Sequence, residues 1–293
     1  MEFALLTAML WSCSGICSAR SGRLLGVLRV NRARLCLALL GLGTAVWWLD
    51  RPTIGPGWGW FVLSGVVGLG MGDISMYAAY RHLGTRLTIL MTQALAVPGV
   101  WIAEWLWLGG DPQWQRMPWA AVILLGLACA MWPDRASPAQ GDRRRGLWFG
   151  FGSAFGLAVA AVLSRRGYAE AGGIDGLGAA VLRNAGGLSV MLLIWPIERL
   201  IAHARQKLVP AEAPQWRRAW PWLLGAAMFG PGIGVACYQT ALATAPSGAV
   251  QAVVATTPVL IIPLAWAIDG DRPTRRSVIG AIIAVIGVIG MVW

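Results

Sequence analysis

The sequence predicts an all-α polytopic membrane protein with ten transmembrane helices, built as two inverted five-helix repeats. Three observations lead to this fold class: an apolar composition, an alternating charge on the loops, and an internal repeat. Apolar residues make up 57% of the 293 residues and charged residues 13%, against roughly 25% charged residues in soluble domains. Such a chain needs lipid as its solvent, and roughly 20 residues per crossing give about ten crossings. The composition excludes a disordered chain, a nucleic-acid-binding domain and an ordinary soluble enzyme.

Apolar runs between clusters of charge, glycine or proline mark the predicted spans. The first half holds spans at 3–19, 35–49, 60–80, 87–108 and 117–132, and the second half at 147–164, 176–197, 219–241, 248–268 and 277–293. The polar stretch 134–146 is interpreted as a linker, which gives a first repeat at 1–133 and a second at 147–293. No basic residue precedes the first apolar run, so we expect a first span there and not a cleaved signal.

Basic residues follow alternate spans. The loops after the first, third, fifth, seventh and ninth spans carry 19 of the 24 lysines and arginines. The excess of positive charge on cytoplasmic loops then predicts that these loops face the cytoplasm. Both termini are accordingly predicted to lie outside.

The two halves repeat each other. A shift of 160 residues lays Trp60–Met131 on Trp220–Met291 without a gap, and 13 of the 72 positions are identical, where composition alone gives roughly six. The matches include Pro98 with Pro258, inside predicted spans, and Asp111 with Asp271, in loops. A duplicated unit explains both matches in one register.

An odd number of spans in each unit forces the second copy to run upside down relative to the first. The loop charges agree, because the Arg81 and Arg86 loop corresponds to a loop without basic residues in the second copy. Inverted repeats are the usual architecture of secondary transporters, in which two packings give alternating access to a site at the midplane. We therefore expect a solute site between the halves, lined by the first, third, fourth, sixth, eighth and ninth spans.

Several segments resemble the EamA type of the drug/metabolite transporter superfamily. In the first copy they are Gly72–Gly84 (GDISMYAAYRHLG), Ala96–Pro98 and Trp105–Asp111, and in the second Tyr238–Leu242, Thr257–Pro258 and Asp269–Asp271. The resemblance covers essentially the whole chain. It implies a ten-helix, multi-pass carrier of small organic solutes in the bacterial inner membrane, similar to bacterial amino-acid exporters.

Two carboxylates lie inside predicted spans, Asp73 and Glu104. Ionisable groups at membrane depth are costly and are functional candidates for that reason. Steps of three and four residues place Tyr77 and Tyr80 on the same helix face as Asp73, so all three are candidate substrate-binding residues. Asp73 and Glu104 are also candidates for proton coupling or a gate. The alternatives stay open: Asp73 caps a kink or pairs with Arg81, and Glu104 reaches to the membrane interface.

The other candidate binding residues are uncharged. They are Gln93 on the stripe of Glu104, Tyr238 and Gln251 in the second half, and Trp11 and Phe155 midway along the first span of each half. An acid facing neutral polar groups favours a zwitterionic or cationic solute, whereas amides and phenols that only join helices are the alternative.

Pro98 and Pro258 are expected to break their helices and to act as flex points.

The sequence indicates no cofactor and no metal site, because the cysteines and histidines lack ligand spacing. Expected partners are a small-molecule substrate and membrane lipid, with no nucleic acid. A homodimer through the fifth and tenth spans is left open. Two other classes are weighed: a structural or assembly membrane protein without transport, and, less favoured, a membrane enzyme that modifies lipid.

Overall fold

The computed structural model describes residues 1–109, 115, 117–130, 142–170, 172–206, 214–269 and 274–292, and it contains no strand in these ranges. The first half holds α1 (Glu2–Leu25), α2 (Val27–Trp48), α3 (Trp58–Gly65), η1 (Val66–Gly72), α4 (Asp73–Leu108) and α5 (Met117–Ala130). The second half holds α6 (Arg143–Glu170), α7 (Gly176–Gln206), α8 (Trp216–Ala227), η3 (Met228–Gly232), α9 (Ile233–Thr244), α10 (Ser247–Val254), α11 (Thr257–Asp269) and α12 (Arg275–Val292). The all-helical prediction is confirmed for these residues.

Within the described ranges, six helical stretches are long and apolar enough to cross a membrane. They are Glu2–Leu25, Trp58–Trp107, Arg143–Glu170, Gly176–Leu200, Trp216–Thr244 and Ser247–Ile268. A shorter apolar helix covers Ala121–Ala130. The chain is therefore a multi-pass membrane protein.

One helical stretch, Trp58–Trp107, contains two of the predicted spans. The backbone departs from helical geometry at Gly84, with φ 76° and ψ 169°. Only glycine adopts this region without strain, because a side chain would meet its own backbone. Gly84 therefore divides α4 into two arms, at the place where the sequence predicts a loop between spans.

The second span was predicted too short. The sequence predicts it at 35–49, but α2 runs from Val27 to Trp48. Asn31 and Arg34 lie buried inside it, so Arg34 is not a loop residue. An arginine next to an apolar run is typical of the end of a span. Arg34 instead lies within the bundle, because it forms an ion pair with a buried acid.

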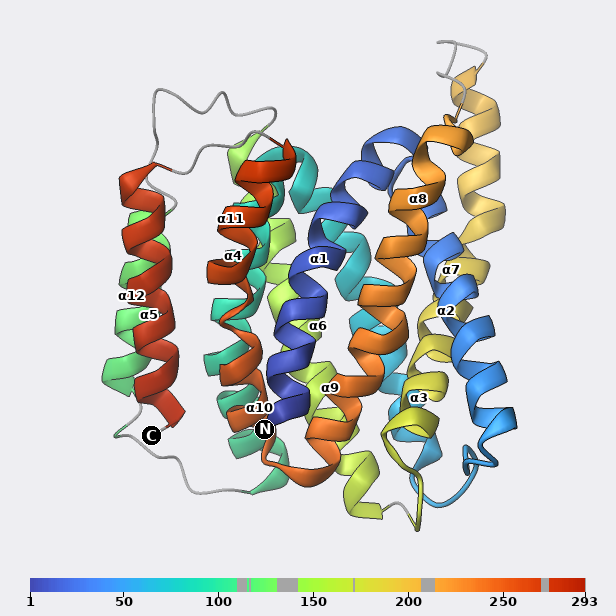
Figure 1. Cartoon of the computed structure of the whole chain (residues 1–293), viewed down its shortest axis with the longest axis horizontal. Helices are drawn as coiled ribbons and strands as arrows, with labels where there is room; N and C mark the ends of the chain where they lie inside the picture. Colours follow the sequence, from blue (N-terminus) through green and yellow to red (C-terminus); the bar gives the residue numbers. More distant parts are fainter. Residues whose placement is uncertain are drawn as a thin grey trace.

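The helices surround α1, which contacts elements of both halves, among them α2, α4, α8, α9 and α11. In Figure 1, α1 lies between α8 and α11, and the N-terminus lies at the same end of the bundle as the C-terminal end of α12. α5 and α12 form a pair at one edge (Figure 1), where Gly126 and Gly280 bring the two backbones together. A homodimer through these two helices stays a prediction.

The glycine-rich segments of the two halves both form π-helix, as η1 and η3. Glycine at these places allows close contact between helices. A Cβ atom on Gly70 would lie 2.7 Å from Val190 Cγ2, and one on Gly156 would lie 3.0 Å from the Cα of Gly72. Because π-helix widens the turn and displaces carbonyl groups, these segments offer acceptors to side chains of neighbouring helices.

We predict that Gly84→Ala lowers the free energy of unfolding by about 1–2 kcal/mol, the cost of a side chain at positive φ. Thermal unfolding in detergent measures the change. Gly41→Ala is the matched control, because Gly41 lies in regular helix with open space around its Cα. An unchanged midpoint for Gly84→Ala would show that the break does not need glycine.

Candidate functional site

A cavity of about 90 Å³ lies between the two halves of the chain. Side chains and backbone of α1, α2, η1, α4, α6, α7, η3, α9 and α11 line it. Four of the sequence-predicted site residues are among them, namely Trp11, Asp73, Tyr80 and Gln93. The lining also includes α2 and α7, which the sequence analysis did not assign to the site.

A buried ion pair stands at this cavity. The Arg34 guanidinium donates through Nη2 to Asp73 Oδ2, and the side chains are only 4% and 13% exposed. Arg34 Nε also donates to Asn31 Oδ1 at 3.0 Å, and the guanidinium lies 5.2 Å above the Tyr77 ring. The predicted alternative of an Asp73–Arg81 pair is not what the structure shows, because Arg34 of α2 occupies the carboxylate.

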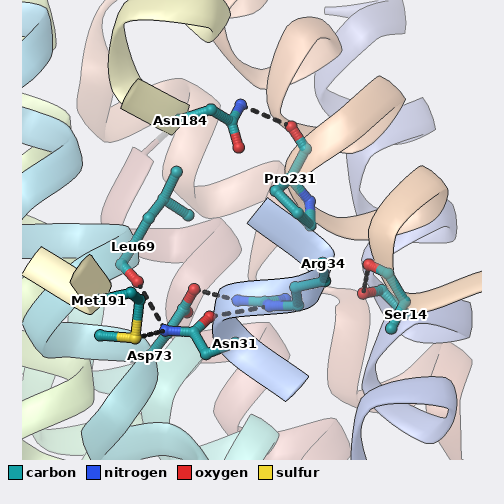
Figure 2. A network of polar contacts seen from close by, with 9 residues as sticks. Ser14, Asn31, Arg34, Leu69, Asp73, Asn184, Met191 and Pro231 are labelled. Atoms are coloured by element: carbon teal, nitrogen blue, oxygen red, sulfur yellow. Dashed lines mark hydrogen bonds and ion pairs between the residues drawn. The ribbon is translucent and has the colours of Figure 1, made fainter. Parts of the chain in front are cut away.

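The Asn31 amide links this pair to the π-helix of the first half. Its Nδ2 donates to the carbonyl oxygen of Leu69 at 3.1 Å and contacts Met191 Sδ at 3.4 Å. Figure 2 shows Arg34 directed at Asp73, with the Asn31 amide between Leu69 and Met191. A carbonyl of η1 thus accepts a hydrogen bond from a side chain of α2.

The second half repeats this arrangement on α7. Asn184 Nδ2 donates to the carbonyl oxygen of Pro231 in η3 at 2.9 Å (Figure 2). The neighbouring Arg183 lines the cavity, is 1% exposed, and lies with its guanidinium carbon 5.6 Å from the centre of the Tyr238 ring. Unlike Arg34, Arg183 keeps two buried nitrogens, Nε and Nη1, without a hydrogen-bond partner in the described part of the chain.

Three of the predicted polar residues form one buried chain. The Tyr238 hydroxyl donates to Gln251 Oε1 at 2.9 Å, and Gln251 Nε2 donates to Gln93 Oε1 at 3.0 Å. Trp11 packs against the Tyr238 ring with 5.1 Å between the ring centres. The chain connects the cavity wall at Gln93 to α9 and α10, so residues from both halves are joined there.

Other predicted residues lie around this centre. Tyr77 is 1% exposed and packs edge to face with Tyr80, 5.7 Å between ring centres. Glu104 accepts a hydrogen bond from Ser247 of α10 through Oε1, so its carboxylate contacts another helix. Phe155 is 62% exposed and does not line the cavity.

The two prolines differ in their surroundings. Pro258 is buried and is the second residue of α11, directly after the turn that separates α10 from α11. Pro98 lies inside α4, where the helix continues through it. Pro258 thus follows a turn between two helices, whereas α4 runs through Pro98.

Sequence reasoning missed Asn31, Arg34, Arg183 and Asn184. Arg183 lies inside the predicted span 176–197, and an arginine at membrane depth is by itself a sign of function. Arg34 was hidden because the second span was predicted too short. Of the lining residues that the structure describes, Arg34, Asp73 and Arg183 carry charge, and their formal charges leave one positive charge in excess.

The fold and the cavity define a multi-pass helical membrane protein with a buried polar centre shared by two halves. The chain belongs to the EamA-like transporter family, whose model matches residues 2–132 and again residues 144–293. This is the EamA type of the drug/metabolite transporter superfamily that the sequence motifs resemble. Membership makes the protein a membrane transporter of small solutes.

Comparison with solved structures agrees with this fold. Twenty-eight chains match, and one, described only as the crystal structure of a protein, has a TM-score of 0.67 at 14% sequence identity. That match covers 99% of this chain and 94% of the other. No curated protein matches the sequence.

We predict that Arg34→Gln lowers the free energy of unfolding by about 3–5 kcal/mol, because it leaves the buried Asp73 carboxylate without its partner. Chemical or thermal unfolding in detergent measures this loss. The double variant Arg34→Gln with Asp73→Asn removes both charges and recovers part of the loss. If the two single losses simply add in the double variant, the pair does not stabilise the bundle as a unit.

Proposed function

We propose that the protein is a secondary transporter that exports amino acids or related small metabolites by alternating access. The observation that carries the proposal is the cavity whose walls come from both halves of the chain. A site shared between two halves becomes open to one side or the other when the halves rock against each other. We further propose that the chain crosses the membrane ten times, as two inverted five-helix repeats at 1–133 and 147–293.

Matched contacts in the two halves support the duplication. In each half an asparagine of the second helix donates to a π-helix carbonyl of the same half, Asn31 to Leu69 and Asn184 to Pro231. In each half an arginine beside that asparagine stacks over a tyrosine, as Arg34–Tyr77 and Arg183–Tyr238. The two separate matches of the family model point the same way.

The roles of the site residues follow from their places. We propose that Trp11, Asp73, Tyr80 and Gln93 contact the solute, since they line the cavity. Tyr77, Tyr238 and Gln251 lie behind them and hold their orientation. Asp73 and Glu104 remain proposed proton-coupling or gating groups, and the turn before Pro258 is a proposed flex point. We do not propose a role for Phe155, because its side chain faces away from the cavity.

We propose a location in the bacterial inner membrane with the basic end of the bundle toward the cytoplasm. The backbone N–H of Gln215 donates to the carbonyl of Leu24, and Arg32 pairs with Glu198 at 3.0 Å, so the predicted first and seventh loops lie at one end. Gly141 falls outside the described residues but lies in the predicted linker. A cysteine at Gly141 should be labelled only from the cytoplasmic side, and labelling from the periplasmic side would reverse the orientation.

We predict that Tyr238→Phe and Gln93→Met each lower the efflux of radiolabelled amino acids from loaded proteoliposomes by about tenfold. Tyr238→Phe removes the hydroxyl that orients Gln251 and, through it, Gln93, whereas Gln93→Met removes the amide at the cavity wall itself. One lost buried hydrogen bond costs about 1–1.5 kcal/mol. Leu193→Ala is the control, because Leu193 is 75% exposed on the outside of the bundle. The opposite outcome is equal efflux from wild-type and variant vesicles, no faster than the passive leak, together with a loss of stability in the variants. It would favour a structural protein without transport.

A further inference from the structure

We infer that Arg183 binds the anionic group of the transported solute, and that the solute is a small carboxylate, amino acids included. The inference rests on the proposed function and names its substrate class. The sequence favours a zwitterionic or cationic solute. The inference differs in that the solute must carry a negative group. Neither the family match nor the sequence motifs assign a role to Arg183.

The first argument is hydrogen bonding. Arg183 is 1% exposed, and its Nε and Nη1 have no hydrogen-bond partner among the described residues. Nη2 lies beside Gly68, where a Cβ atom would come within 3.0 Å of it. A guanidinium presents its N–H groups as a planar fork that matches the two oxygens of a carboxylate. Buried donors without acceptors are costly unless a ligand supplies the acceptors.

The second argument is charge. Arg34 is neutralised by Asp73 and is further held by Asn31. Arg183 forms no ion pair in the described part of the chain: Asp73 acts on it only from a distance and is itself held by Arg34. The Tyr238 ring, 5.6 Å away, offers only a weak cation–π attraction. The charged residues that line the cavity therefore leave one positive charge at membrane depth. A monoanion cancels that charge, whereas an amine without a carboxylate would add to it.

The third argument is the size and lining of the cavity. Its volume of about 90 Å³ exceeds several times the roughly 10–15 Å³ that one water needs. The cavity therefore has room for a small solute. The wall also contains apolar side chains, namely those of Leu69, Met76, Ile89, Leu157 and Val235. A carboxylate with a short apolar body fits such a site better than a highly charged metabolite.

A structural role and a ligand-binding role for Arg183 predict opposite effects of its substitution on the stability of the ligand-free protein. If Arg183 only held helices together, its removal would destabilise the protein, as we expect for Arg34. If Arg183 is kept for a ligand, Arg183→Gln removes an uncompensated buried charge and leaves the ligand-free protein as stable or more stable.

The test measures thermal unfolding of the purified protein with L-alanine, L-leucine, their carboxamides, isoamylamine and inorganic phosphate. Wild type, Arg183→Gln, Arg183→Lys and the surface control Arg166→Gln are compared. Arg166 pairs with Glu170 on the outside and is 51% exposed, so its substitution removes the same charge away from the cavity. We expect the amino acids to stabilise wild type and Arg166→Gln. We expect the carboxamides and isoamylamine to stabilise neither.

We expect Arg183→Gln to weaken amino-acid binding by about 10- to 100-fold, the loss of a charge-assisted hydrogen bond. Arg183→Lys should keep the charge but weaken binding through the loss of the planar fork, and it serves if the Gln variant does not fold. Four results would overturn the inference. They are equal stabilisation by the amides or the amine, an undiminished shift of the unfolding midpoint in Arg183→Gln, stabilisation by phosphate alone, and no shift of the midpoint with either amino acid.

Efflux of the same compounds from proteoliposomes separates this inference from the proposed function. Efflux of an amide or amine at the rate of its amino acid would leave transport standing and overturn the role of Arg183. Binding that depends on Arg183 without efflux of any compound would support the carboxylate site and contradict the transport function.

Discussion

The interior of this bundle depends on how buried charge is neutralised inside an apolar chain. Arg34 lies in α2 and Asp73 in α4. Either charge alone would be costly at membrane depth. The ion pair, with Asn31 bound to Arg34 on one side and to η1 on the other, allows three polar side chains to sit within the bundle. The network links α2 to η1 and to α4, while the most extensive packing of α2 is against α7.

The π-helical segments are the backbone counterpart of that network. Glycines in η1 allow α6 and α7 to approach closely, and the displaced carbonyls of both π segments receive an asparagine amide. This likeness between the halves is what the proposed duplication of one unit predicts. Glycine-rich composition alone is ambiguous, since it also suits helices that pack closely without any site.

The sequence predicted the all-helical class and most of the helix positions, because long apolar runs between charge clusters are a strong signal. It named Gln93, Tyr238 and Gln251 as candidate binding residues, with bonds that only join helices as the alternative. The structure joins the three by hydrogen bonds, and of them Gln93 lines the cavity. It failed at Arg34, since a charge inside an apolar run cannot be told from the end of a span without its partner. It overlooked Arg183, although this arginine lies inside the predicted span 176–197. Phe155 was misplaced for another reason: the middle of a span does not tell which face turns inward.

The two halves differ in how their buried arginines are paired. Both second helices carry an arginine stacked over a tyrosine, yet Asp73 neutralises only the one in the first half. No carboxylate lies in the corresponding span of the second half, 219–241. An exact duplicate would hold two closed ion pairs and offer little to a ligand, whereas this chain keeps one pair for structure and leaves the other arginine facing the cavity. In the proposed duplication, the absence of an acid from the second half is what leaves Arg183 available for the proposed carboxylate site.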